Sequence, residues 1–326
     1  MTVECSYFGT CGGCSYQDLE YESQLELKRE LVEGTLSQPV FSTIPSPKPY
    51  HYRHTISLTV KKREGHLRFG FTGQDGRGFV PIDSCAIADE RLNQYIPEAF
   101  RRLSELPEKR RYHTSQIALR VGDGESIATT LRTDRGKTLE CTVADKRFSY
   151  AVSSFFQHNV SILDRLTEAI HQLLAPSGKE TLIDLYSGVG LFSISLAAFY
   201  KRVRGIEEGY EAVKHAKLNA ERNGVLNAKF FEGKVESKIK EIKKIKSPIH
   251  MIADPPRAGL RPEVIKAITT LRKVEKLIYV SCSLESLKRD LNLFAEKFQI
   301  KSVQPIDLFP QTKHVETLVL LNRKNA

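Results

Sequence analysis

The sequence has no apolar run long enough to cross a bilayer, which takes about 20 residues. Its longest apolar runs, such as LFSISLAAF at 191–199, are short and interrupted by serine. The first residues, MTVEC, also lack the basic start and apolar core of an export signal. We therefore expect a cytoplasmic protein, in which thiols stay reduced and disulfide bonds do not form.

Acidic residues are in deficit, because 39 Asp and Glu face 49 Lys and Arg and leave a formal net charge of +10. The basic residues gather in three clusters, at 101–111, 201–204 and 234–246. Any one of these clusters could be an ordinary solvated helix face. The excess over the whole chain instead favours a polyanionic partner, RNA or DNA.

Cysteines are few, yet three of the six fall within the first 14 residues. Cys5, Cys11 and Cys14 have the spacing C-x5-C-x2-C. Gly12 and Gly13 permit a tight turn that lets neighbouring thiolates converge on one metal. In a protein whose thiols stay reduced, this spacing indicates a metal site.

A fourth ligand would have to come from elsewhere in the chain. Cys85, in the loop-like PIDSCAIAD, is the best candidate, whereas Cys141 lies in an alternating stretch that predicts a strand with its thiol facing a core. The sequence lacks the second C-x2-C or the histidine pair of a zinc ribbon. Three clustered cysteines and one remote cysteine favour a [4Fe–4S] cluster over zinc, with free surface thiols as a third alternative.

The hydrophobic pattern changes along the chain, which is long enough for two domains. Residues 17–36 have the period of an amphipathic helix, and residues 52–150 alternate between glycine-rich turns, which predicts a mainly antiparallel β region with one helix at 88–105. From about residue 151, short apolar strands alternate with helices, the rhythm of a doubly wound parallel α/β sheet. We expect four segments: a cysteine segment at 1–16, a helical region at 17–40, a β-rich domain at 41–150 and an α/β domain at 151–326.

Polar residues follow several of the expected strands in the α/β region. TLIDLYSGVG at 181–190 is a buried strand and a tight turn, in which Gly188 lets the backbone approach a ligand, although NAD enzymes have related turns. Glu207, at the tip of the next strand, can accept hydrogen bonds from ribose hydroxyls. In HMIADPP, two prolines fix a turn that aims Asp254 into the crevice. This order is typical of a methyltransferase that uses S-adenosylmethionine.

Cys282 ends the following expected strand and stands directly before a helix. Because a helix N-terminus stabilises a thiolate, we interpret this cysteine as a nucleophile with a lowered pKa rather than as a core residue. A methyltransferase needs a nucleophile when its substrate is uracil, since thiolate addition at carbon 6 lets carbon 5 accept a methyl group. A base must then remove the carbon 5 proton, and Glu316, just ahead of the last strand, is placed for that step.

With these motifs, the chain resembles the RNA uracil-C5-methyltransferase family over nearly its whole length. The matching elements, in the family's order, are CSYFGTCGGC with Cys85, YRHTISL, SSFFQHN, DLYSGVG, GIE, DPPR, SCS and HVE. The resemblance implies an iron–sulfur segment and a β-rich RNA-binding domain ahead of a Rossmann-like methyltransferase domain. It also implies these roles: Cys282 as nucleophile, Glu316 as base, Gln157, Tyr186, Glu207 and Asp254 at S-adenosylmethionine with Asp254 near the transferred methyl, Phe155 on the target uracil, Arg53 on a phosphate, and Cys5, Cys11, Cys14 and Cys85 on a [4Fe–4S] cluster.

The chain departs from the family pattern at several positions. Leu191 and Lys234 stand where relatives carry polar residues beside the cofactor, so we expect neither to be a ligand. Ser283 and Leu284 replace the usual Asn-Pro after the nucleophile. The chain also begins at the cysteine segment, without the β-barrel domain of many members, and so resembles the branch that acts on 23S ribosomal RNA. We therefore expect a monomeric enzyme that methylates 23S ribosomal RNA, with transfer RNA as the alternative substrate.

Two other functions fit parts of the pattern. An amino-methyltransferase acting on a nucleic-acid base or on protein glutamine would end its D-P-P motif in an aromatic residue, where this chain has Arg257, and would need no cysteine. A non-catalytic iron–sulfur RNA-binding factor could keep the fold without the chemistry, but Cys282, Glu316 and Asp254 argue against it. If the cluster exists, its ligands tie the N-terminus to the loop of Cys85, which favours a structural role for it.

Overall fold

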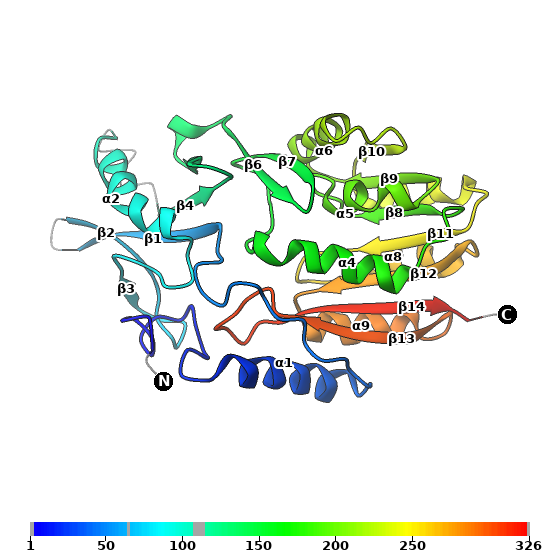
Figure 1. Ribbon diagram of the computed structural model, residues 1–326, viewed down its shortest axis with the longest axis horizontal. Coiled ribbons are helices and arrows are strands. Elements are labelled where there is room, and N and C mark those ends of the chain that lie inside the picture. Colours follow the sequence, from blue (N-terminus) through cyan, green and yellow to red (C-terminus); the bar gives the residue numbers. More distant parts are fainter. Residues whose placement is uncertain (1–2, 64–65, 107–114, 325–326) are drawn as a thin grey trace.

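A computed structural model of the protein describes residues 3–63, 66–106 and 115–324 (Figure 1). A five-stranded sheet and a seven-stranded sheet lie at opposite ends of the molecule. In the described part of the chain, no helix is both long and apolar enough to cross a membrane. The second half of the basic cluster at 101–111 lies outside the described residues.

The larger sheet has the strand order β10-β9-β8-β11-β12-β14-β13. The first five strands in this order pair in parallel, which confirms the strand–helix alternation predicted from the sequence. β14 differs from that prediction, because it pairs antiparallel with both of its neighbours. A short connection at 307–315 joins β13 to β14, whereas a parallel pair would need a longer crossover. The strands are β8 (Thr181–Leu185), β9 (Arg202–Glu207), β10 (Ala228–Glu232), β11 (Ile249–Ala253), β12 (Val274–Ser281), β13 (Phe298–Ile306) and β14 (Glu316–Arg323).

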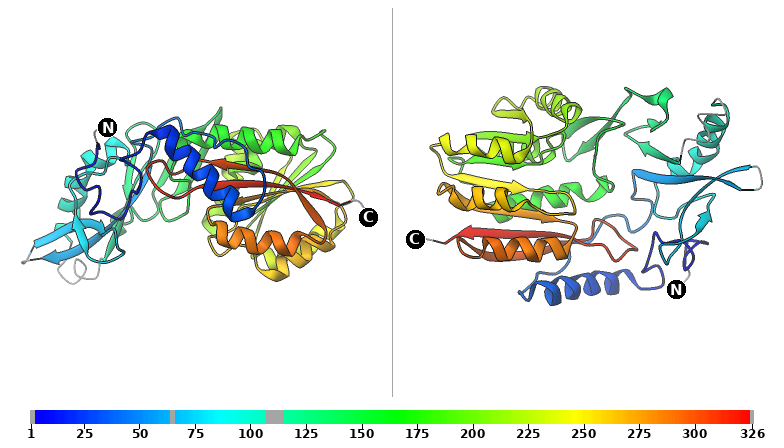
Figure 2. Two further views of the ribbon diagram at one scale, coloured as in Figure 1. Left: turned by 90° about the horizontal axis from the view of Figure 1, so that it is seen from below. Right: turned by 180° about the vertical axis from the view of Figure 1, so that it is seen from behind.

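Helices cover both faces of this sheet and close a hydrophobic core on each (Figure 2). Because both faces are covered, every residue of β8 and β11 is buried. The carboxyl ends of the parallel strands point toward the smaller sheet (Figure 1). One face carries α4 (Leu163–Leu174), α5 (Leu191–Ser195) and α6 (Tyr210–Arg222); the other carries α1 (Tyr21–Leu36), α7 (Val235–Lys238), α8 (Pro262–Thr270) and α9 (Leu284–Phe294).

The smaller sheet is antiparallel throughout, with the order β3-β2-β1-β4-β5. Its core is completed by α2 (Glu90–Ser104), which buries Leu92, Ile96 and Leu103 against the sheet and confirms the helix predicted at 88–105. The Asp89 side chain caps this helix by accepting from the Arg91 backbone N–H. The strands are β1 (Thr55–Arg63), β2 (His66–Thr72), β3 (Phe79–Pro81), β4 (Gln116–Val121) and β5 (Ile127–Thr129).

A separate hairpin, β6 (Thr138–Val143) and β7 (Lys146–Ala151), joins the two sheets. Its apolar side chains belong to the core of the larger sheet, beside α5 and α6, and not to the core of the smaller one. Cys141 is buried there, as the alternating pattern predicts. Alternation shows that one face of a strand is buried, but not which core buries it, so the sequence grouped this hairpin with the β-rich region.

α1 precedes the smaller sheet in the chain but packs against α9 and β13 of the larger one (Figure 2). Its contact includes an ion pair between Lys28 Nζ and Asp307 Oδ1 at 2.5 Å, with both side chains fully buried. Lys28 Nζ also donates to the Phe309 carbonyl at 3.0 Å. Burial lowers the pKa of Lys28 and raises the pKa of Asp307 despite their contact, so desolvation outweighs their attraction.

This balance predicts that breaking the ion pair is far more harmful than replacing it. Lys28→Met should lower the free energy of unfolding by about 3–5 kcal/mol, because it leaves the buried Asp307 carboxyl without its counter-ion. The double variant Lys28→Met/Asp307→Leu should recover most of that loss. Urea unfolding of the wild type, both single variants and the double variant measures the difference. A double variant as unstable as the two losses added together would contradict the prediction.

Candidate active site

A cavity of about 710 Å³ opens at the carboxyl ends of the parallel strands, on the side of the smaller sheet. Its walls come from the ends of β8, β9, β11 and β12, from the start of β14 and from loop 153–158. With Arg53 and Phe309, residues from eight separate stretches of sequence therefore meet in one place. The sequence-predicted residues that line it are Arg53, Phe155, Gln157, Tyr186, Gly188, Glu207, Asp254, Cys282 and Glu316.

The turn after β8 forms the floor for a ligand. Tyr186, Gly188 and Gly190 all have positive φ angles, of 63°, 52° and 90°. No atom lies within 4 Å of the position where a side chain on Gly188 would begin, so its backbone faces open space. Glu207 orders this turn, since its carboxylate accepts from the Gly188 N–H at 3.0 Å and from the Gly209 N–H at 2.7 Å.

Cys282 and Glu316 come together from neighbouring strands of the sheet. Cys282 follows β12 directly, and Glu316 begins β14, which pairs with β12. The Glu316 side chain is only 6% exposed, although a glutamate that begins a strand is usually solvated. Burial and the nearby Asp254 carboxyl raise the pKa of Glu316 well above its usual range. Burial and the buried Asp184 raise the pKa of Asp254 in turn.

The thiol of Cys282 differs from the sequence expectation in one respect. Its pKa is raised, not lowered, because burial and the Glu316 carboxyl destabilise the thiolate. Arg257 opposes this effect, since its charge and a hydrogen bond to the thiol favour the thiolate. Sequence reasoning did not assign a role to Arg257; the only signal was its place directly after the two prolines of HMIADPPR.

Removing the Arg257 charge should make Cys282 still harder to ionise. Because the pKa of this thiol is already raised, its alkylation rate should continue to increase above pH 9.0, the ordinary pKa of a cysteine thiol. Arg257→Gln should lower the alkylation rate at pH 8.5 by about threefold to tenfold. This range corresponds to a rise of up to about one unit in the pKa of Cys282, which lowers the thiolate fraction. Iodoacetamide labelling followed by mass spectrometry of peptide 277–288 measures it. Arg272→Gln, at an exposed position, is the matched control, and equal rates in both variants would refute the role of Arg257.

Two further predicted residues lie at the mouth of the cavity. Phe155 is 63% exposed and packs edge-to-face against His158, with 6.0 Å between ring centroids. Arg53 lines this cavity and also a second one, which contains the N-terminal cysteines. Its backbone bridges the Ala88 and Asn159 backbones, so it lies where the two sheets meet.

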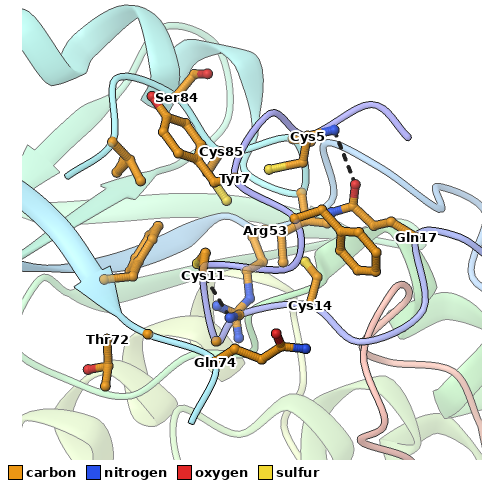
Figure 3. A pocket seen from close by; sticks show the side chains of 18 of the residues that line it. Cys5, Tyr7, Cys11, Cys14, Gln17, Arg53, Thr72, Gln74, Ser84 and Cys85 are labelled. Carbon is orange, nitrogen blue, oxygen red and sulfur yellow. Dashed lines mark hydrogen bonds between the residues drawn. The ribbon is translucent and has the colours of Figure 1, made fainter. Parts of the chain in front are cut away.

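The second cavity, of about 330 Å³, is lined by Cys5, Cys11, Cys14 and Cys85, all with free thiols (Figure 3). Three come from the N-terminal turn and Cys85 comes from the connection between β3 and α2. Burial and the charges of the other three thiols together raise the pKa of Cys14 to about 12, so the four are close enough to interact. Among the described residues, no group of three or more His, Cys, Asp or Glu is arranged as a finished metal site.

Gly12 allows the cysteine segment to dock on the smaller sheet. A side chain at this position would begin 2.6 Å from the Gly73 carbonyl oxygen, which no residue but glycine tolerates. The Gly12 N–H donates to the Thr72 carbonyl at 3.0 Å and the Gln74 N–H donates to the Thr10 carbonyl at 2.9 Å. The four sulfur donors form an entirely soft ligand set, which fits an iron–sulfur cluster or zinc and not a hard cation.

Comparison with known proteins identifies the family of the chain. A family model described as tRNA (uracil-5-)-methyltransferase matches residues 130–324, the hairpin and the whole of the larger sheet. The chain belongs to this family. It is an RNA methyltransferase that uses S-adenosylmethionine, built on the mixed α/β fold of such enzymes.

Relatives of this methyltransferase match almost all of it. An uncharacterized RNA methyltransferase of Clostridium acetobutylicum is 30% identical, over 98% of this chain and 83% of the relative. A tRNA (uracil(54)-C(5))-methyltransferase of Schizosaccharomyces pombe is also 30% identical, over 98% of this chain and 66% of the relative. The crystal structure of the Pyrococcus abyssi tRNA (uracil-54, C5)-methyltransferase with S-adenosyl-L-homocysteine has a TM-score of 0.74 at 26% identity, covering 95% of this chain and 84% of that one.

Proposed function

We propose that this RNA methyltransferase transfers a methyl group to carbon 5 of a uridine through a covalent bond between Cys282 and the base. The observation that carries the proposal is the meeting of Cys282, Asp254 and Glu316 in one cavity with the glycine turn at Gly188. A thiol, a carboxyl of raised pKa and a backbone turn open to a ligand are what this chemistry requires.

The reaction begins when the Cys282 thiolate adds to carbon 6 of the uracil and makes carbon 5 electron-rich. Bound S-adenosylmethionine would supply an electrophilic methyl group to carbon 5, its sulfur–methyl bond breaking to leave S-adenosylhomocysteine. Glu316 then takes the proton from carbon 5, the carbon 6–sulfur bond breaks, and the thiolate leaves. Arg257 favours the thiolate both when it adds to carbon 6 and when it leaves.

The cofactor would lie over the turn after β8. Glu207 would accept hydrogen bonds from the ribose hydroxyls, and Tyr186 and Gln157 would contact the remainder from either side of the cavity. Asp254 would lie near the transferred methyl. Phe155, exposed at the mouth, would stack on the target uracil once that base is turned out of a folded RNA.

The cysteine cavity would hold a [4Fe–4S] cluster on Cys5, Cys11, Cys14 and Cys85. The four thiols among the residues that line it support the proposal, and zinc is the alternative that the same four ligands permit. We propose a structural role for the cluster, fastening the N-terminal segment to the smaller sheet, which would bind RNA. The enzyme would act as a monomer in the cytoplasm.

Removing one cluster ligand tests this structural role. Cys11→Ser should lower metal affinity by more than about 100-fold, since even the outer partners of metal ligands contribute about 10–100-fold. It should also lower the unfolding temperature and the methylation rate together. Metal analysis, thermal unfolding and methyl transfer are measured alongside Cys141→Ala, whose thiol lies outside the cavity. A Cys11→Ser variant that folds and methylates normally would show that the cluster has no structural role.

The substrate RNA has two candidates. One is 23S ribosomal RNA, the substrate expected from the sequence. The other is uridine 54 of transfer RNA, which the names of the Schizosaccharomyces pombe and Pyrococcus abyssi relatives favour. The test offers the enzyme labelled S-adenosylmethionine and both RNAs, unmodified, and digests the products for mass spectrometry of 5-methyluridine. Label in one RNA alone identifies the substrate. Label at another atom or base, or in neither RNA, would overturn the proposed function.

A further inference from the structure

Three buried nitrogens lack a hydrogen-bond partner where the smaller sheet meets loop 153–158. They are Arg53 Nε, Arg120 Nε and His158 Nδ1. Thr55 stands opposite Arg120 in the β1–β4 pair, and Arg53 lies two residues before Thr55. His158 hydrogen-bonds to the Thr55 backbone, so all three side chains start from the same small area.

The charge in this area is positive and uncompensated. Burial together with the charges of Arg53 and Arg120 lowers the pKa of His158 to about 4. Arg120 is bonded to the neutral carbonyl of Ser154, and burial lowers its pKa as well. In the described part of the chain, neither arginine forms an ion pair. Half-buried cations without a counter-ion are unfavourable, and an anionic ligand would remove that penalty.

The same area adjoins the mouth of the active site. Arg53 and His158 line the cavity, and the His158 ring touches Phe155, the proposed platform for the target base. Arg120 is not among the residues that line the cavity, but it donates to the carbonyl of Ser154, which is. A nucleotide whose base stacks on Phe155 carries its phosphate next to that base, within reach of this area.

We infer that Arg53, Arg120 and His158 form a phosphodiester-binding site that holds the RNA backbone beside the target uridine. The inference rests on the proposed function and extends it, since a phosphate contact was expected of Arg53 alone. Guanidinium and imidazole N–H groups make strong hydrogen bonds to phosphate oxygens. Such contacts fix the position of the RNA without reading its sequence, so the site would serve either candidate RNA.

The test measures RNA affinity without methyl transfer, by fluorescence anisotropy at pH 8 and at several salt concentrations between about 50 and 200 mM. Arg120→Gln should weaken binding about tenfold and reduce the slope of log affinity against log salt by about 1, because one cation at a phosphate is lost. Arg120→Lys, which keeps the charge, should restore the slope. His158→Gln should weaken binding without changing the slope, since this histidine is neutral at pH 8. Arg272→Gln, at an exposed position away from the cavity, is the control.

Each outcome decides the inference. A salt slope that Arg120→Gln leaves unchanged, or that Arg120→Lys fails to restore, would overturn it and reduce Arg120 to a support for loop 153–158. Cofactor affinity, measured by calorimetry, should be the same in every variant, because a collapsed loop would change it. If the wild type binds RNA with these slopes but forms no 5-methyluridine, the phosphate site stands and the proposed function fails. If the enzyme forms 5-methyluridine but the variants have the salt slope of the wild type, the proposed function stands and the phosphate site fails.

Discussion

Cys282→Ala should abolish the formation of 5-methyluridine, with a fall in rate of at least about 10⁴-fold, the loss seen when a covalent nucleophile is removed. The physical reason lies in the substrate, because carbon 5 of uracil attacks a methyl group only after a thiolate has added at carbon 6. S-adenosylmethionine affinity should change by less than about twofold, since the thiol adds nothing to cofactor binding in the proposed mechanism. Radiolabelled methyl transfer and calorimetry measure the two quantities.

The matched control for this prediction is Cys141→Ala. Cys141 is another cysteine outside the N-terminal cavity, but its thiol is buried in the core of the larger sheet beside α6 and does not line the active-site cavity. This control should lower stability by about 1 kcal/mol and leave the methylation rate within about twofold. A Cys282→Ala variant that keeps a tenth of the wild-type rate would mean that the base is methylated without covalent help.

Glu316→Gln should convert the enzyme into a trap for its substrate. Addition of the thiolate and methyl transfer do not need the carboxylate, but release of the product does, because the carbon 5 proton must leave before the carbon–sulfur bond can break. Turnover should fall by about 10²–10⁴-fold, the usual contribution of a general base. A methylated protein–RNA complex that survives denaturation should accumulate, and a denaturing gel with labelled RNA measures it.

Glu180→Gln is the matched control. Glu180 is another buried glutamate, and it stands directly before β8, at the end of that strand away from the cavity. This variant should neither slow turnover nor produce a complex. If Glu316→Gln turns over at the wild-type rate, the proton acceptor is another group, and Asp254 would be the next to test. If it binds both substrates and forms no complex, Glu316 acts before the covalent step.

The ends of parallel strands explain why much of the site could be predicted. Asp254 and Cys282 each follow an apolar strand, and the carboxyl ends of parallel strands meet at one edge of a sheet. Local sequence was therefore enough to group them. The placement of Glu316 follows a different rule, since β14 enters the sheet antiparallel and its first residue, not its last, reaches that edge.

What the sequence did not show depends on contacts between distant residues. The raised pKa of Cys282 comes from burial and from Glu316 across the β12–β14 pair, and no feature next to Cys282 in the chain indicates it. The Lys28–Asp307 pair joins residues at opposite ends of the sequence. An alternating strand pattern likewise fixes which residues of β6 are buried but not the sheet that buries them.

The most direct test of the covalent mechanism uses RNA in which the target uridine is replaced by 5-fluorouridine. Fluorine on carbon 5 leaves no proton for Glu316 to remove, so the reaction should stop after methyl transfer with Cys282 still bonded to carbon 6. After ribonuclease and trypsin digestion, mass spectrometry should find peptide 277–288 carrying a methylated fluorouridine, and only when S-adenosylmethionine was present. An adduct on a different residue, or methylated product released from an unmodified peptide, would contradict the mechanism proposed here.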